Sequence, residues 1–122
     1  KRILLSFLNL GDIYNHDEVV RLRIFLEDRD RDIKFAKEPF ESKSNIYNNV
    51  HFKVVDVLTG KTIIPFDESL NSTRLSADSE GMYFDFHMNS LPRGRSYRFD
   101  FLIVVSGSKF LISDTASKFT VR

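Results

Sequence analysis

The sequence contains no cysteine. Disulfide bonds, thiolate metal sites and cysteine nucleophiles are therefore excluded. Glycine is also scarce, with five residues, and no phosphate-binding glycine loop, GxSxG motif or Ser–His–Asp arrangement can be identified. Because these absences remove the commonest signatures of an enzyme, we expect no catalytic activity and no cofactor.

An excess of charge of one sign is missing too. The chain has 18 basic and 17 acidic residues, and their signs are interspersed. A nucleic-acid-binding protein normally shows a basic excess or a basic stripe, so nucleic acid is not an expected partner. No apolar run approaches the ~20 residues that span a bilayer, and no signal peptide is visible.

The methionines of the chain are Met82 and Met88, and its first residue is Lys1. We therefore expect residues 1–122 to be a single domain that is part of, or processed from, a larger protein. A hydrophobic fraction of 42% argues against intrinsic disorder. Twelve phenylalanines and no tryptophan indicate a core organised around phenylalanine.

Alternation of apolar and polar residues dominates the chain. Val20, Leu22, Ile24 and Leu26 alternate with mostly polar neighbours, which is the pattern of a half-buried strand. The same period predicts strands within residues 46–58, 61–66, 81–89, 96–105, 109–114 and 118–122. Turn residues separate these segments, and no convincing helix of ten residues exists, so the pattern predicts an antiparallel sandwich or barrel.

Two stretches are less regular. Residues 67–80 are polar and predict a connection with a short strand near residues 73–75, whereas residues 27–49 predict a long loop holding one strand at residues 33–36. Pro65 has no N–H, so its strand should lie or end at a sheet edge.

The most specific local signal is the segment LPRGRSYRF at residues 91–99. Its Leu91, Gly94 and Tyr97 resemble the tyrosine corner at the entry to the penultimate strand of fibronectin-III and immunoglobulin-like domains. The resemblance implies a buried ring whose hydroxyl returns to the backbone just upstream, a turn permitted by Gly94, and Leu91 closing the end of the core. The alternative is an ordinary turn followed by an exposed tyrosine.

The resemblance implies an all-β fold, an antiparallel immunoglobulin-like β-sandwich of about seven to nine strands. Without a cysteine pair or a tryptophan, the chain is not of the antibody type. More loosely, the forms GxYFD at Gly81 and LxxGRxY at Leu91 resemble the Ig-like domains of virion structural proteins of tailed bacteriophages. That resemblance implies a structural role in a capsid, neck, tail or fibre.

Two sets of residues could carry chemistry, and each has a simpler interpretation. Asp28, Asp30 and Asp32 alternate as in a calcium loop, but Ile33 and Pro39 stand where that loop needs Gly and Glu, which favours a solvated loop without a metal. The second set has two parts. The histidines His16, His51 and His87 lack the spacing of metal ligands. The mid-strand carboxylates Asp56, Asp85 and Asp100 are better explained as partners in ion pairs. His51 and His87 are expected on outward faces.

Two features could carry binding. Phe35, Phe40 and Tyr47 form a candidate interaction surface in the long loop, with capping of the core as the alternative. The other feature is an unpaired edge strand, for which the final strand ending at Arg122 is the candidate.

The leading hypothesis is a non-catalytic structural or protein-interaction domain of a larger homo- or hetero-oligomeric assembly, located in a virion. The alternative is a carbohydrate-binding or adhesion module on a virion or cell surface, or otherwise extracellular, with a glycan as ligand. The alternative needs at least two coplanar exposed aromatic rings, for which Tyr14, Tyr47 and Tyr83 are available.

Overall fold

The computed structural model describes residues 3–28, 49–105 and 107–122, and these residues lie mostly in β-strands. The strands are β1 Ile3–Phe7, β2 Ile13–Tyr14, β3 Val19–Asp28, β4 Val50–Asp56, β5 Thr62–Ile64, β6 Ser76–Asp78, β7 Gly81–His87, β8 Arg95–Val105 and β9 Ser108–Val121. A short 3-10 turn at Met88–Ser90 follows β7. In the described part of the chain, no helix has the length and apolar character needed to cross a membrane.

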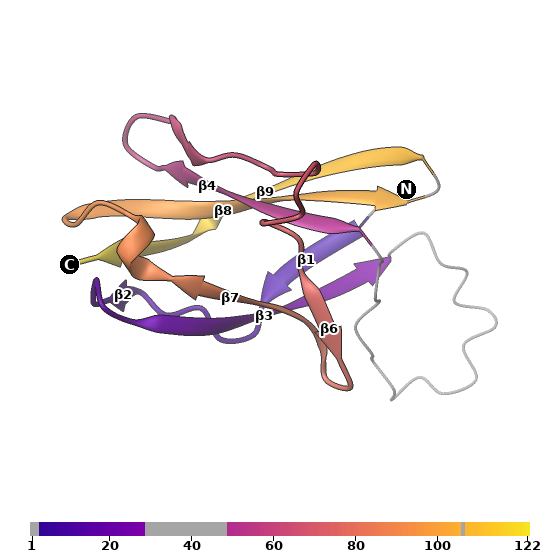
Figure 1. The fold of residues 1–122 in the computed structure, drawn as a ribbon, viewed down its shortest axis with the longest axis horizontal. Coiled ribbons are helices and arrows are strands. Elements are labelled where there is room, and N and C mark those ends of the chain that lie inside the picture. The colour runs from indigo at the N-terminus through magenta and orange to yellow at the C-terminus, as the bar shows by residue number, and fades with distance from the viewer. Residues whose placement is uncertain (1–2, 29–48, 106) are drawn as a thin grey trace.

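The strands form two sheets that pack face to face (Figure 1). One sheet has the order β1-β3-β7-β6, and the other has the order β2-β9-β8-β4-β5. Neighbouring strands are antiparallel except β2 and β9, which pair in parallel. The all-β antiparallel sandwich predicted from the sequence is confirmed, with nine strands among the described residues.

The strand order also matches a specific type of sandwich. The sheet β1-β3-β7-β6 corresponds to strands A, B, E and D of immunoglobulin-type sandwiches, and β9-β8-β4 corresponds to G, F and C. β5 takes the place beside β4 that strand C′ has in the variable type. The described connections from β5 to β6 and from β7 to β8 each cross from one sheet to the other.

The core lies where the inward faces of the two sheets meet. In β3 and β7 buried side chains alternate with more exposed ones, because successive residues of a strand point to opposite faces. In β8 the alternation is incomplete, since Asp100 and Leu102 are buried together with the core-facing residues. The buried residues on these strands that face the core are Leu22, Ile24, Leu26, Met82, Phe84, Phe86, Tyr97, Phe99, Phe101 and Ile103. A slip of one residue in any of these pairings would turn apolar side chains to solvent, so the pattern determines the register.

Phe99 of β8 lies at the centre of a phenylalanine cluster. Its ring centroid is 5.2 Å from that of Phe84, 5.3 Å from Phe86 and 5.0 Å from Phe119. The first two contacts are edge-to-face and the third is stacked, which are the geometries that aromatic pairs prefer. The expected core of phenylalanines is thus built around this ring.

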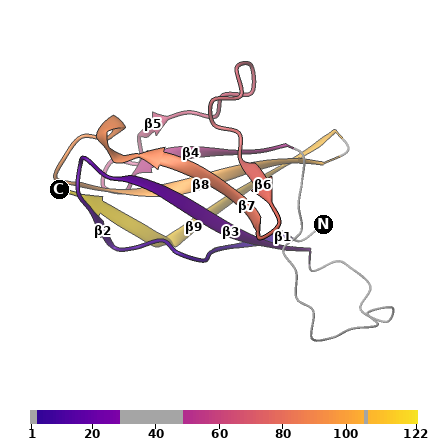
Figure 2. The same ribbon diagram turned by 60° about the horizontal axis from the view of Figure 1, so that its bottom comes forward.

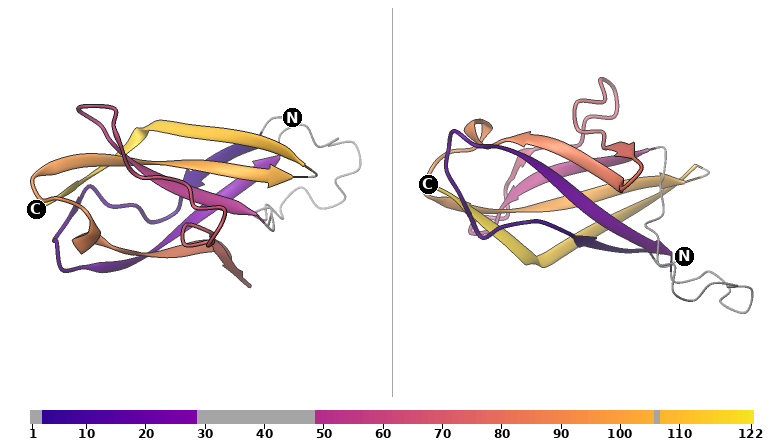
Figure 3. Two further views of the ribbon diagram at one scale, coloured as in Figure 1. Left: turned by 45° about the horizontal axis from the view of Figure 1, so that its top comes forward. Right: turned by 90° about the horizontal axis from the view of Figure 1, so that it is seen from below.

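Several predicted strands differ from the observed ones. The segments at residues 109–114 and 118–122 belong to one strand, β9, interrupted by a bulge in which the register shifts between Arg98 and Asp100. The bend of β9 is visible in the right view of Figure 3. Residues 73–75 form only a single bridge, His51↔Arg74, and the regular strand β6 begins one residue later. The strand predicted at residues 33–36 lies outside the described residues.

Candidate functional site

The corner residues lie where the chain enters β8. The Tyr97 ring is buried, and its hydroxyl donates a 2.7 Å hydrogen bond to the carbonyl oxygen of Pro92. Gly94 has a φ of 78°, which glycine adopts without strain, and its N–H donates to the Val121 carbonyl at 2.7 Å. Leu91 is buried in the core cluster. Because burial raises the pKa of Tyr97, its phenol stays protonated and serves as a structural donor.

The three mid-strand carboxylates are not brought together. Asp56 and Asp100 lie on β4 and β8 of one sheet, whereas Asp85 lies on β7 of the other sheet. Asp56 pairs with Arg95 at 2.7 Å, and Asp100 pairs with Arg98 at 3.2 Å. The hydrogen bond from Arg95 lowers the pKa of Asp56. These groups stabilise their strands as ion pairs and form no acid–base pair with one another.

A shallow pocket adjoins the corner. Its lining residues are Asp56, Val57, Leu58, Gly94, Arg95 and Ser96. Since the carboxylate and the guanidinium in this pocket bind each other, the charges neutralise each other and the pocket has no converging reactive groups.

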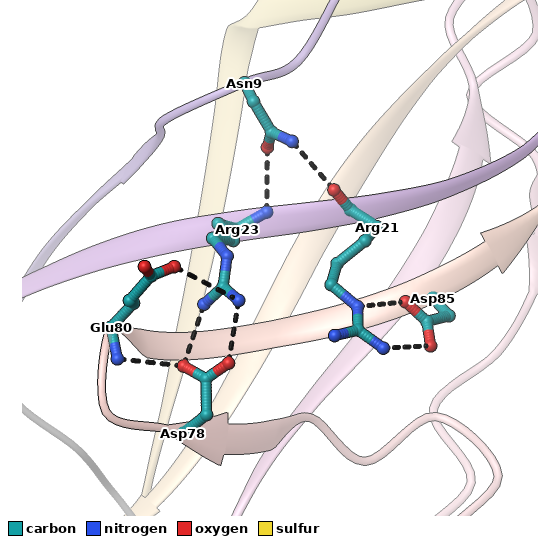
Figure 4. Close-up of polar contacts among 6 residues, drawn as sticks. All are labelled: Asn9, Arg21, Arg23, Asp78, Glu80 and Asp85. Carbon is teal, nitrogen blue, oxygen red and sulfur yellow. Dashed lines mark hydrogen bonds and ion pairs between the residues drawn. The ribbon is translucent and has the colours of Figure 1, made fainter.

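Two arginines cover the outward face of Tyr83. The guanidinium carbons of Arg21 and Arg23 lie 4.3 and 5.2 Å from the centroid of its ring. Arg21 binds both carboxylate oxygens of Asp85 at 2.7 and 3.1 Å, and Arg23 binds both of Asp78 at 2.9 and 2.7 Å (Figure 4). The hydrogen bond from Arg23 lowers the pKa of Asp78 to about 2. The sheet face is thus occupied by its own ion pairs and cation–π contacts.

Asn9 continues the pairing of β1 along the edge of β3. The Leu8 N–H still donates to the Arg23 carbonyl at 3.0 Å, as in a regular ladder. Beyond it, the Asn9 side-chain carbonyl accepts from the Arg23 N–H at 2.8 Å, and its amide donates to the Arg21 carbonyl at 2.7 Å (Figure 4). The side-chain amide replaces a peptide group, so this part of the β3 edge is closed after the main chain turns away.

The tyrosines considered for glycan binding do not form a platform. Tyr14 is buried with its ring edge-on to Phe119, and its hydroxyl accepts a 2.6 Å hydrogen bond from the Gly11 N–H. Tyr83 is covered by the two guanidinium groups. Tyr47 lies outside the described residues. Tyr14 and Tyr83 therefore do not supply the coplanar exposed rings that a lectin-like site needs.

The histidines lie apart from one another, and one of them is buried although the sequence suggested an exposed side chain. His51 lies on the outward side of β4, since its neighbours Val50 and Phe52 face the core, but it is 0% exposed, so the prediction of a surface histidine is wrong there. His87 is exposed as expected. The Nδ1 atom of His51 lies 3.1 Å from the hydroxyl oxygen of Thr73, which also accepts from the Asp67 N–H at 2.8 Å. Burial lowers the pKa of His51, because it penalises the charged form.

Several predicted residues lie outside the described part of the chain: Phe35, Phe40, Tyr47, Asp30, Asp32 and the side chain of Asp28. Among the described residues, no group of three or more His, Asp or Glu side chains could hold a metal ion.

The outer edge of β4 is covered from end to end. β5 pairs with its second half, and the connection from β5 to β6 passes along its first half before it crosses to the other sheet (Figure 2). There the Phe52 N–H donates to the Thr73 carbonyl at 3.0 Å, and the Leu75 N–H donates to the Val50 carbonyl at 2.8 Å. Pro65 follows β5 directly, at the sheet edge where its missing N–H is tolerated.

The end of the final strand is also covered, contrary to the sequence-based expectation. The Thr120 N–H donates to the Asp12 carbonyl at 2.8 Å, and the Arg122 N–H donates to the Tyr14 carbonyl at 3.0 Å. Both bonds come from the parallel pairing with β2, a two-residue strand that the alternation pattern did not indicate because it is too short. The candidate edge at Arg122 is therefore occupied.

The first part of β9, at residues 108–113, has no strand on its outer side. This part runs along the upper border of the molecule in the left view of Figure 3. Among the described residues, no group forms a hydrogen bond with the backbone of Lys109, Leu111 or Ser113. The side chain of Leu111 is 61% exposed. A row of unpaired backbone groups beside an exposed leucine is a template for another strand, so this open edge is the candidate functional site.

Other edge strands are shorter. β5 and β6 have three residues each, and β1 has five. Short edge strands are one way in which proteins prevent unwanted pairing. The open edge of β9 is the longer stretch, and it carries a single charged residue, Lys109, whose ammonium group binds Glu68 at 3.2 Å.

Comparisons with models of protein families, with the sequences of characterised proteins and with solved structures give no match to this chain.

Proposed function

We propose that this chain is a non-catalytic interaction domain that joins proteins within a larger assembly, and that the assembly is a virion. The open edge of β9 carries the proposal. Its backbone groups at Lys109, Leu111 and Ser113 are unpaired, while the other side of the same sheet is closed by β5 and by residues 73–75. An edge left open in a molecule that covers its opposite edge is suited to accept a partner strand.

The arrangement of charge supports the same function. The mid-strand carboxylates bind arginines, and the tyrosine on the outward face of β7 lies under two guanidinium groups. These groups are committed to contacts within the domain. The strand order and the hydroxyl bond at Tyr97 support the resemblance to immunoglobulin-like domains. The virion part of the proposal comes from the looser resemblance of the segments at Gly81 and Leu91 to domains of phage virion proteins. Fold alone assigns no function, so the edge and its test decide the proposal.

The experiment compares native masses by light scattering, in material isolated from the source that produces the protein. We expect the wild-type chain in a species of defined mass, heavier than one chain. Leu111→Lys places a charge on the open edge and should lower that mass, since edge lysines prevent pairing. Leu70→Lys is the matched control, because Leu70 is 83% exposed in a loop. A wild-type chain of monomer mass at every concentration, or equal masses for all three proteins, would overturn the proposal.

A further inference from the structure

We infer that the strand accepted by the open edge is β9 of a second copy of this chain, paired antiparallel across a two-fold axis at Leu111. The inference rests on the proposed function and names its partner. The two sheets of order β2-β9-β8-β4-β5 would then join through β9 into one continuous sheet.

The direction of the backbone groups on β9 follows from its neighbour β8. The N–H of Val104 donates to the Asn49 carbonyl at 2.9 Å, so Val104 directs its backbone groups toward the β4 side. In an antiparallel pair, residues alternate between bonding one neighbour and facing away from it. Lys109 stands opposite Val104, and its backbone groups therefore point away from β8. The same alternation places those of Leu111 and Ser113 on the open side.

These three open residues are symmetric about Leu111. A two-fold axis at Leu111 places Leu111 opposite Leu111 of the second copy, and Lys109 opposite Ser113 of the second copy. Each of these pairs exchanges two backbone hydrogen bonds in the antiparallel pattern. With the axis at this residue, every open backbone group of Lys109, Leu111 and Ser113 finds a partner. An interface of this kind is isologous, as in most homodimers.

The side chains suit the same register. Phe110 would stand opposite Ile112 of the second copy, an aromatic and β-branched pair of the kind that stabilises sheets. Both residues are half-buried at the edge of the core. The exposed Leu111 side chains would cover each other on the outer face. Lys109 would meet Ser113, so no like charges stand opposite each other.

The two ends of the open stretch set its length. A tight turn at Gly107, with a φ of 81°, joins β8 to β9 at the pair Val105↔Ser108. At the other end, the bulge after Ser113 bends the strand, and beyond the bulge the outer side of β9 is paired with β2. A partner strand can therefore pair with residues 108–113. The same residues of a second copy form a stretch of equal length.

Disulfide trapping tests this register, because the chain contains no cysteine of its own. Opposed residues of a hydrogen-bonded antiparallel pair have Cα atoms about 5.5 Å apart, which a disulfide spans. Leu111→Cys should therefore form a covalent dimer under mild oxidation of the full chain. Leu58→Cys is the matched control, since Leu58 is 88% exposed away from β9, and it should remain at least tenfold less crosslinked.

A second pair of variants distinguishes this register from a shifted one. Lys109→Cys and Ser113→Cys should each crosslink poorly alone and efficiently when the two proteins are mixed. Circular dichroism of each variant verifies that the fold is retained. If a cysteine variant is unfolded, alanine replaces the residues on either side of its cysteine. That protein is mixed with the wild-type chain, and the mass of the mixed dimer is measured instead.

The outcomes separate the two proposals. Equal crosslinking of Leu111→Cys and Leu58→Cys overturns the second-copy inference. If Leu111→Lys still lowers the native mass in that case, the edge binds a different protein and the proposed function stands. If neither variant has an effect, both proposals fail.

Discussion

Phe99 stacks on Phe119 with ring centroids 5.0 Å apart and an interplanar angle of 17°, across the bulge in β9. Phe119 comes from the part of β9 beyond the bulge, where odd-numbered residues face the core, whereas Phe110 and Ile112 before it are even-numbered. The bulge therefore changes which side chains of β9 point inward. It brings Phe119 under Phe99 while the earlier part of the strand keeps its own inward residues.

Replacing the central ring should cost much of the stability of the domain. Phe99→Ala removes a fully buried ring and leaves a cavity, so we expect a loss of about 3–5 kcal/mol in the free energy of unfolding. Leu58→Ala, at a side chain that is 88% exposed, should stay within about 0.5 kcal/mol of wild type. Urea denaturation followed by tyrosine fluorescence measures both. Similar midpoints for the two variants would contradict the position of Phe99 in the core.

Removing the hydroxyl oxygen of Tyr97 at the corner should lower the free energy of unfolding by a smaller amount. Tyr97→Phe keeps the buried ring but removes the donor to the Pro92 carbonyl, so unfolding should become easier by roughly 1 kcal/mol. Tyr83→Phe is the control, because Tyr83 contacts the arginines through the face of its ring. Circular dichroism during urea titration measures both. An unchanged midpoint for Tyr97→Phe would show that the hydroxyl bond does not stabilise the corner.

His51 predicts a dependence of stability on pH. Burial lowers its pKa in the folded chain, and the unfolded value is about 6.5. As the pH falls below about 6.5 the unfolded chain takes up the proton first, so the free energy of unfolding decreases, whereas above this pH the histidine contributes no slope. The charged groups that act on the ring are Glu68 and Asp67, which favour its charged form, and Arg74, which opposes it.

The experiment compares the slopes of stability against pH between about 7 and 5, where carboxylates contribute little. His51→Gln should flatten the slope relative to the wild type, because it removes the group whose pKa burial lowers. Equal slopes for wild type and His51→Gln would argue against burial of a neutral imidazole.

The ion pair of Arg23 with Asp78 predicts a titration at low pH. The hydrogen bond from Arg23 holds the pKa of Asp78 at about 2, below its ordinary value of 3.8. The stabilisation that this carboxylate provides is therefore present above pH 3.8 and is lost as the pH falls toward 2. In Arg23→Gln, the pKa of Asp78 followed by NMR should rise toward 3.8.

Arg21→Gln serves as the comparison for that titration. It should raise the pKa of Asp85 instead, because the Arg21 hydrogen bond is the main cause of the lowered pKa there. If Arg23→Gln left the pKa of Asp78 unchanged, the carboxylate would be held by another group.

The strands that could be predicted are those whose pattern is local. The alternation from Val20 to Leu26 and from Met82 to Met88 predicts strands, since neighbours in sequence decide which face each side chain takes. The corner is equally local, because its donor and acceptor are five residues apart. Such features follow from the sequence before any sheet is assembled.

Pairings between distant residues could not be predicted in this way. His51 sits on a strand whose outward residues were expected to be exposed, and it is buried because Thr73, 22 residues away, packs on it. The partner of Asp85 is Arg21, 64 residues away, and no spacing in the sequence indicates that pair. Long-range contacts depend on how the strands are ordered, which local pattern does not specify.

By itself, the sequence determined that the protein is a cysteine-free sandwich of alternating strands with a buried tyrosine at a turn, because side-chain period and turn chemistry are properties of neighbouring residues. Only the tertiary structure decided which edge of that sandwich is open. The final strand was the expected edge, yet the parallel pairing with β2 covers its end at Thr120 and Val121, and the bulge leaves Lys109, Leu111 and Ser113 without partners on their outer side. The physical reason is that a strand edge is open only where no other strand pairs with it. Pairing is a contact between segments far apart in the chain, so the local sequence of one strand does not decide it.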